Sequence, residues 1–278
     1  MKSLIILVLF LSLSLSLSGQ KPQTKSINKS GQFVLGTVEK IQSAALHETR
    51  KLNIYLPEGY SADSAGTYPV IYLLDGSANE DFIHITGLVQ FLTMIEAMPA
   101  SIVVGIANVD RKRDFTFPTS IENDKKDFPT TGGSAKFITF VEKELQPFIQ
   151  KKFKANASKT IVGQSLGGLL ATEILLTKPE LFNNYMIISP SLWWDNESLL
   201  LKVPGFLAKE TAQETQVYVS VGTEGKQMED DAGKLAEALQ TGQKKGLKVK
   251  FVPMPNENHL TILHNSAYKG FEILFSKK

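Results

Sequence analysis

Short apolar runs rich in β-branched residues alternate along this chain with longer amphipathic stretches, and this alternation limits the folds open to it. A run that is apolar at most successive positions is typical of a strand buried on both faces of a parallel sheet. Six such runs cover residues 70–74, 102–106, 160–162, 185–188, 217–221 and 249–252. A further pair of strands is expected at the start of the fold, over residues 33–41 and 52–56.

The stretches beside these runs have helical periodicity. It is clearest over residues 135–151, 166–177, 230–242 and 267–275. Strands separated by helices of this length predict βαβ crossovers. We therefore expect an α/β fold, with a mostly parallel central sheet and helices on both faces, in a single domain over residues 32–278. Ser134, which follows two glycines, is expected to cap the helix over 135–151.

The N-terminus predicts a secretory signal peptide over residues 1–19, followed by a flexible polar lead over residues 20–31. Lys2 gives a positive start, residues 4–13 are apolar, and small residues lead to Gly19. The apolar run is shorter than the roughly 20 residues that a spanning helix needs. We therefore expect export, to the periplasm or the medium, with no integral membrane segment after cleavage.

The charge balance and the absence of cysteine limit the binding partners and the nucleophiles that the chain can have. Lysine and arginine number 30 against 28 acidic residues, so there is no basic footprint for nucleic acid. A small uncharged or mixed-charge substrate is easier to reconcile with this balance, and the expected partner is a small-molecule or glycan ester. Without cysteine the chain has no thiol nucleophile, thiolate metal site or lipid attachment point.

A nucleophile motif lies between a predicted strand and a predicted helix. Residues 163–167 read Gly-Gln-Ser-Leu-Gly, directly after the strand at 160–162 and directly before the helix at 166–177. This is the setting that a nucleophile elbow requires, because the serine is held in a strained turn and the glycines let strand and helix pass closely. We predict Ser165 as the nucleophile of an α/β-hydrolase fold.

A serine nucleophile needs a base, which in this fold follows it in the sequence. His47 and His84 precede Ser165 and are expected to be surface or packing residues. His259 and His264 both follow the last predicted strand. We predict His259 as the base. It lies in a polar loop, whereas His264 directly follows the apolar segment 261–263.

The acid of the triad is expected just after the strand at 217–221. Glu224 lies there, at the end of the sheet where open α/β sheets keep their sites. Asp230 and Asp231 compete for the role, but both suit the first turn of the following helix. We predict Glu224 as the acid.

The oxyanion hole needs two backbone donors. We expect one to be the N–H of Leu166, at the start of the helix after Ser165. The second is expected in the loop after the strand at 70–74, from either Gly76 or Ser77.

With these residues in place, the chain resembles the putative-esterase family of α/β hydrolases over roughly residues 32–275. The segments that carry the resemblance are 70–76, 104–111, 113–116, 137–148, 162–169 and 189–195. Within the family it is most similar to the branch of siderophore trilactone esterases, which act on enterobactin- or bacillibactin-type esters. Esterase D, feruloyl and acetyl xylan esterases and mycolyltransferases are more distant relatives.

The resemblance implies an acyl-enzyme on Ser165, with His259 relaying protons and no metal or organic cofactor. It also implies that the acid of the triad can be displaced or absent in this branch. Arg111, together with Arg113, is a candidate for holding an anionic substrate group, against the alternative of ion pairs with Asp110 and Asp114. Trp193 and Trp194 are candidates for the wall of an acyl or catechol pocket, against the alternative of core packing.

The expected function is therefore hydrolysis of carboxylic esters, with a siderophore trilactone as the favoured substrate. Three alternatives remain open. They are a carbohydrate acyl esterase for acetyl or feruloyl groups, an acyltransferase that resolves the acyl-enzyme with an alcohol, and an inactive binding protein of the same fold.

Overall fold

The computed structural model describes residues 31–276 except residue 64. The predicted signal peptide and residues 20–30 of the polar lead lie outside the described residues. One compact unit begins at Val34, and it carries the whole sheet. No helix within residues 31–63 and 65–276 is long and apolar enough to cross a membrane.

The core of this unit is an eight-stranded sheet with the strand order β1-β2-β4-β3-β5-β6-β7-β8. The β1–β2 and β2–β4 pairs are antiparallel and every other pair is parallel. The strands are β1 Thr37–Ser43, β2 Glu48–Tyr55, β3 Tyr68–Leu73, β4 Ile102–Ile106, β5 Ala155–Gln164, β6 Asn184–Ile188, β7 Thr215–Gly222 and β8 Leu247–Met254. The expected α/β-hydrolase fold is confirmed.

Side-chain alternation along the strands builds a separate core on each face of the sheet. In β3, Val70 and Tyr72 pack into one core whereas Ile71 and Leu73 pack into the other. This is the period-two geometry of a strand that is buried on both sides. It explains why the strand runs are apolar almost without interruption.

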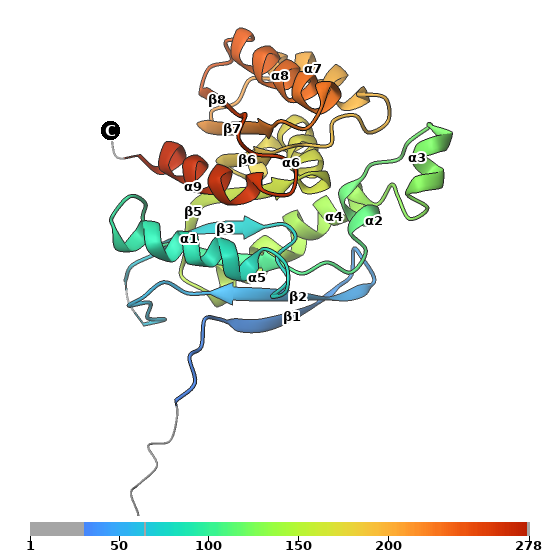
Figure 1. Cartoon of the computed structure of the whole chain (residues 1–278). Helices are drawn as coiled ribbons and strands as arrows, with labels where there is room; N and C mark the ends of the chain where they lie inside the picture. The colour runs from blue at the N-terminus through green and yellow to red at the C-terminus, as the bar shows by residue number, and fades with distance from the viewer. Residues whose placement is uncertain (1–30, 64, 277–278) are drawn as a thin grey trace, which may run out of the picture. The chain divides into compact units, whose positions relative to one another are not determined.

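Helices cover both faces (Figure 1). The smaller core lies under α1 and α9, which pack beside each other, and the larger core lies under the helices between α4 and α8. The α-helices are α1 Phe82–Met94, α2 Arg111–Phe115, α3 Glu122–Asp127, α4 Ser134–Phe140, α5 Gln146–Lys152, α6 Leu166–Thr177, α7 Val203–Ala208, α8 Lys226–Thr241 and α9 Ile262–Phe275. Shorter turns are a π-helix at Val141–Leu145 and 3₁₀ turns at Pro179–Leu181 and Ser198–Lys202.

Several helix boundaries differ from the sequence-based expectation. The helix expected over 135–151 is divided by the π-helical turn Val141–Leu145. The prediction that Ser134 is the N-cap residue was wrong. Gly133 is the N-cap residue, and Ser134 is the first residue of α4. The helices expected from 230 and 267 begin earlier, at Lys226 and Ile262. Helix α9 therefore includes residues 262–266, which its pattern of apolar residues did not indicate.

The parallel strands place their carboxyl ends at one edge of the sheet. The loops that leave β3, β5, β6, β7 and β8 therefore meet there, which is where open α/β sheets carry their sites. These five loops contain Ser165, Glu224 and His259.

Candidate active site

Ser165 lies in a strained turn between β5 and α6. Its backbone has φ 59° and ψ −120°, a conformation that L-residues rarely adopt. Close packing holds the turn, since a Cβ added to Gly163 would lie 2.3 Å from the Gly167 carbonyl oxygen. The Ser165 N–H also donates to the Ile188 carbonyl oxygen at 3.1 Å, which ties the turn to β6. This is the geometry of a nucleophile elbow.

Glu224 and His259 lie next to each other at the same sheet edge. His259 Nδ1 lies 2.6 Å from Glu224 Oε2, joining the loop after β7 to the loop after β8. The Glu224 side chain is only 2% exposed, whereas that of His259 is 40% exposed. The carboxylate is therefore sheltered while the imidazole reaches the surface of the site.

Hydrogen bonds keep the Glu224 carboxylate ionised despite its shelter. Burial acts to raise the pKa of this carboxyl, but hydrogen bonds from His259, Ser189 and the Gly222 N–H outweigh it and hold the pKa below its usual value. Ser189 Oγ donates to Oε1 at 2.5 Å and the Gly222 N–H donates to the same oxygen at 2.9 Å. Both carboxylate oxygens are thus occupied, which fixes the orientation of the acid.

The hydrogen bond to Glu224 also determines which nitrogen of His259 is basic. An ionised carboxylate only accepts hydrogen bonds, so Nδ1 of His259 carries the hydrogen. In the neutral ring Nε2 is then a free acceptor, as a general base requires. Within the described residues Ser165 Oγ has no hydrogen bond to His259; it lies 3.3 Å from Ser191 Oγ. Such contacts often tighten only when substrate is bound.

Ser165 and His259 open into one cavity of about 560 Å³. Its lining residues come from the loops at the carboxyl ends of β5 to β8 and from the start of α8. They are Ser165, Ser191, Trp193, Thr223, Glu224, Met228, Asn258 and His259.

The two tryptophans have different places. Trp193 lines the cavity, in keeping with the predicted pocket wall. Trp194 is fully buried, and its Nε1–H donates to the Phe117 carbonyl at 2.9 Å, so it is a core residue. The structure therefore favours the predicted pocket-wall position for Trp193 and the alternative of core packing for Trp194.

The candidate oxyanion donors are also distinguished by their hydrogen bonds. Leu166 is the first residue of α6, so its N–H has no partner within the helix. The Gly76 N–H donates to the Ile106 carbonyl at 3.0 Å and is committed to the sheet edge. The Ser77 N–H donates to Glu80 Oε2 at 3.3 Å, a long bond that an oxyanion could replace. This geometry favours Ser77 over Gly76.

Arg111 is held by Asp75 in the loop after β3. Its Nε donates to Asp75 Oδ1 at 2.6 Å and its Nη2 donates to Asp75 Oδ2 at 2.9 Å, a bidentate pair. Nη2 also lies 3.3 Å from the carbonyl oxygen of Gln164, the residue before the nucleophile. Arg111 is absent from the residues that line the cavity at Ser165. Arg111 therefore pairs with Asp75 and not with Asp110 or Asp114, whereas Arg113 does pair with Asp114. The geometry of Arg111 favours support of two loops over contact with substrate.

The competing acids lie away from His259. The Asp231 side chain is 1% exposed and pairs with Lys234 at 3.0 Å. Asp230 pairs with Lys226 at 2.5 Å on the surface of α8. Only Glu224 of the three therefore contacts the predicted base.

Within residues 31–63 and 65–276 no group of three or more His, Cys, Asp or Glu side chains could hold a metal ion.

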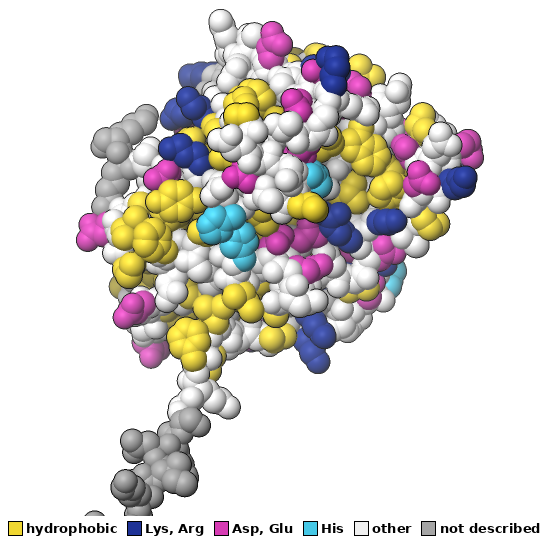
Figure 2. All heavy atoms as spheres, viewed as in Figure 1, with side chains coloured by type: hydrophobic (Ala, Val, Ile, Leu, Met, Phe, Trp, Pro, Cys, Tyr) yellow, Lys and Arg dark blue, Asp and Glu magenta, His cyan; other side chains and the backbone are white. Residues whose placement is uncertain are grey.

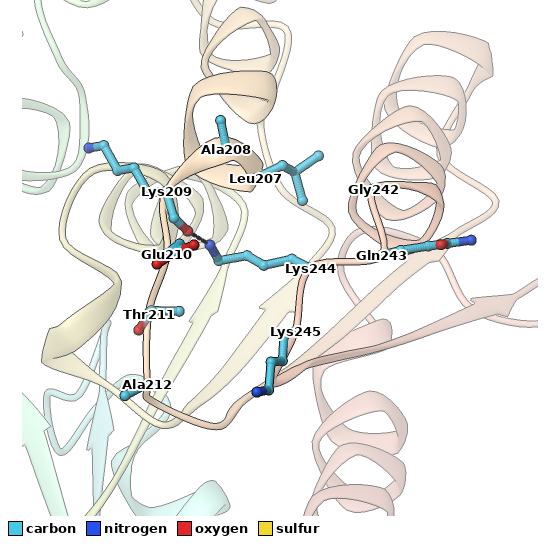
Figure 3. Close-up of a pocket in the computed structure, with 10 residues that line it drawn as sticks. All are labelled: Leu207, Ala208, Lys209, Glu210, Thr211, Ala212, Gly242, Gln243, Lys244 and Lys245. Carbon is cyan, nitrogen blue, oxygen red and sulfur yellow. Dashed lines mark hydrogen bonds between the residues drawn. The ribbon is translucent and has the colours of Figure 1, made fainter.

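A second hollow of about 610 Å³ lies between the ends of α7 and α8 (Figure 3). Three lysines line it, and Lys244 Nζ donates to the carbonyl oxygen of Lys209. This contact satisfies the end of α7. The lining has no serine, histidine or aspartate, so it offers no second set of the predicted triad residues.

Sequence reasoning missed three polar residues that support the site. Ser189 and Ser191 follow β6, where one holds Glu224 and the other contacts Ser165. Asp75 has φ 54° and anchors Arg111. The sequence held a signal for each, because all three are polar residues within three positions of a strand's carboxyl end.

The fold, with Ser165, Glu224 and His259 at the carboxyl edge of its sheet, defines the class of an α/β hydrolase. The family described as Putative esterase matches residues 43–268. The chain belongs to this family and is a carboxylic ester hydrolase of its siderophore esterase branch.

One similar protein bears a name that specifies a substrate. Ferri-bacillibactin esterase BesA of Bacillus subtilis is 30% identical over 256 residues, which cover 84% of this chain and 88% of BesA. Two solved structures are similar over most of their length. An IroE-like serine hydrolase from Shewanella oneidensis has a TM-score of 0.79 and 32% identity, covering 86% of this chain and 80% of its own. The BES protein from Bacillus cereus has a TM-score of 0.79 and 31% identity, covering 90% and 98%.

Proposed function

We propose that this protein is an exported serine esterase that cleaves the backbone esters of a siderophore. The observation that carries the mechanism is the shared cavity of Ser165 and His259, with the Nδ1 side of the imidazole held by Glu224. The relation to a ferri-bacillibactin esterase supports the substrate class.

In the proposed reaction, His259 Nε2 takes the proton of Ser165 Oγ as that oxygen attacks the ester carbonyl. The N–H groups of Leu166 and Ser77 stabilise the oxyanion that forms. His259 then gives the proton to the leaving alkoxide, which departs as an alcohol. Water attacks the acyl-enzyme by the same route in reverse and releases the acid. Glu224 stabilises the imidazolium in both halves of the reaction.

The cavity has features that suit a bulky ester. It is open to solvent, about 560 Å³ in volume, and walled on one side by Trp193. An indole can stack on the aromatic ring of a catecholate arm while the ester lies near Ser165. A cavity of this size falls within the range of small-molecule sites, roughly 300–1,000 Å³.

The mechanism is tested with purified mature protein and p-nitrophenyl butyrate. We expect turnover, with kcat lower by about 10⁴-fold or more in Ser165→Ala. Ser198→Ala is the matched control, because its hydroxyl bonds to Asp195 outside the cavity. Equal kcat in Ser165→Ala and wild type would refute the serine mechanism.

The substrate is tested by chromatography and mass spectrometry of products from ferric bacillibactin, ferric enterobactin and acetylated xylan. Release of linear siderophore fragments, at a kcat/KM well above that for xylan deacetylation, is expected. Preferred deacetylation would support the carbohydrate esterase alternative. Ester products formed with an added alcohol, in place of free acid, would support the acyltransferase alternative.

Export is tested by cell fractionation and N-terminal sequencing. A mature chain that begins near Gly19 or Gln20 and is found outside the cytoplasm is expected. An intact N-terminus in the cytoplasmic fraction would contradict this part of the proposal.

A further inference from the structure

Two histidines outside the cavity join the helices that follow the two catalytic loops. His84 Nε2 lies 2.7 Å from His264 Nδ1, and the two ring planes are inclined by only 8°. A separation of 2.7 Å is shorter than the roughly 3.5 Å between stacked carbon atoms. Nearly parallel rings this close must therefore meet edge to edge, with an N–H of one directed at the lone pair of the other. The contact is a well-aligned hydrogen bond.

The two histidines hold equivalent positions. His84 is the third residue of α1, which follows the loop that carries Ser77. His264 is the third residue of α9, which follows the loop that carries His259. In the view of Figure 2 they form a continuous histidine patch over the place where α1 and α9 lie side by side.

Each loop is bonded tightly to its own helix. On the α1 side, the N–H groups of Glu80 and Phe82 donate to the Ser77 carbonyl at 3.0 and 3.4 Å, and the Asp81 N–H donates to Asp75 O at 3.1 Å. The position of α1 therefore determines the position of the candidate oxyanion donor.

The base loop has a similar arrangement. The N–H groups of Thr261 and Ile262 donate to the Asn258 carbonyl at 3.1 and 3.0 Å, while Thr261 Oγ1 accepts the Asn258 N–H at 3.0 Å. His259 lies inside this turn. The position of α9 therefore determines the position of the candidate base.

We propose that the His84–His264 hydrogen bond is a positioning contact that sets the spacing between the oxyanion donor at Ser77 and the base His259. The inference rests on the proposed serine esterase mechanism. Neither histidine lines the cavity, so neither is a catalytic residue. The pair acts through the two helices and the loops that are bonded to them.

The environment of the pair suits this role. Burial and the neighbouring His264 both lower the pKa of His84, so the uncharged N–H···N form is favoured near neutral pH. The helices themselves are held by apolar packing, with Ile85 and Val89 of α1 and Ile262 and Phe271 of α9 fully buried in one core. Loss of one partly exposed hydrogen bond should leave that packing intact.

The test uses His84→Ala, His264→Ala and the double variant, all in the full mature protein. We expect kcat for p-nitrophenyl butyrate to fall about tenfold in each single variant, because small misplacements of catalytic groups are costly, with KM changed less than twofold. The double variant should be no slower than the single variants, because both substitutions break the same bond. His47→Asn is the matched control, a histidine with φ 56° in the β1–β2 turn, where asparagine is tolerated.

A second measurement does not depend on activity. Amide hydrogen exchange in His84→Ala should accelerate at least threefold in residues 256–261, a segment that does not contain the substitution. Acceleration confined to α1, an unchanged kcat, or losses that multiply in the double variant would each overturn the positioning role. If the wild-type protein neither hydrolyses the ester nor reacts with a fluorophosphonate at Ser165, the proposed function fails, and the exchange measurement alone decides the positioning contact.

Discussion

Glu224 and His259 are 35 positions apart in the sequence, yet His259 Nδ1 lies 2.6 Å from Glu224 Oε2. The adjacent parallel strands β7 and β8 explain this proximity, because their carboxyl ends release both loops at one sheet edge. Ser189 and the Gly222 N–H hold the other carboxylate oxygen. The acid is therefore fixed in place rather than displaced.

Replacement of Glu224 by Gln should disable the base without unfolding the protein. The neutral amide no longer stabilises an imidazolium, and its NH₂ group can select the wrong tautomer of His259. We expect kcat to fall by roughly 10²–10⁴-fold with little change in KM, measured by steady-state kinetics. Asp230→Asn is the control and should retain full activity, because Asp230 pairs with Lys226 on α8. Wild-type kcat in Glu224→Gln would show that the acid is dispensable.

Arg111→Gln separates a supporting role from substrate binding. The substitution leaves the Asp75 carboxylate, with its side chain 11% exposed, without its bidentate partner. We expect a loss of about 1–3 kcal/mol in the free energy of unfolding and a kcat about tenfold lower, with KM nearly unchanged. Lys126→Gln, at an exposed position of α3, is the control and should alter neither quantity. A large increase in KM at unchanged kcat would instead assign Arg111 to the substrate.

The glycines of the elbow and of α8 should respond to alanine in opposite ways. A Cβ on Gly163 would lie 2.3 Å from Gly167 O, so Gly163→Ala should cost roughly 2–3 kcal/mol and most of the activity. A Cβ on Gly233 meets nothing within 4 Å inside α8. Gly233→Ala should therefore stabilise the protein by about 0.5–1 kcal/mol. Urea unfolding measures both, and a destabilised Gly233→Ala would contradict the packing described.

Asp81, at the start of α1, should make stability depend on pH. Burial raises the pKa of its carboxyl to about 7; the charges of Asp75 and Glu80 add to the rise and Arg111 opposes it. The unfolded chain releases this proton near pH 3.9. Between about pH 4 and 7 the folded state binds more protons than the unfolded state, so the contribution of Asp81 to stability falls as pH rises.

Asp81→Asn removes this dependence. We expect the variant to exceed wild type by roughly 1 kcal/mol in the free energy of unfolding at pH 8, with the gain vanishing near pH 4. Urea unfolding at both pH values measures the difference. Asp63→Asn, in an exposed loop, is the control and should show no pH-dependent gain. A gain in Asp81→Asn that is the same at pH 4 and pH 8 would disprove the assignment.

The buried parallel strands were predictable because each contains a local apolar run, whereas the opening pair expected over 33–41 and 52–56 is observed at Thr37–Ser43 and Glu48–Tyr55. The strand expected over 102–106 is observed as Ile102–Ile106, since a strand buried on both faces shows its full length in its hydrophobicity. Helix α1 was not among the clear predictions. Its sequence has a glycine and several β-branched residues, which favour helix poorly, and packing against the sheet overrides that preference.

The sequence also predicts Ser165, Glu224 and His259 as a triad, because a strand-to-helix glycine motif and the ends of two later strands identify these residues along the chain. The structure brings Glu224 and His259 into contact. The choices between alternatives needed the fold. Only packing distances decide that Trp193 reaches the cavity while Trp194 is buried. Only the hydrogen bonds decide that the Gly76 N–H is committed to Ile106.

By itself the sequence determined the alternation of strands and helices, the nucleophile motif and the order of its partners, since these depend on residues close together in the chain. The tertiary structure decided which distant side chains meet. The sequence indicated His84 as a surface or packing residue and His264 as the weaker candidate for the base. Their hydrogen bond exists only because α1 and α9 pack on the same face of the sheet.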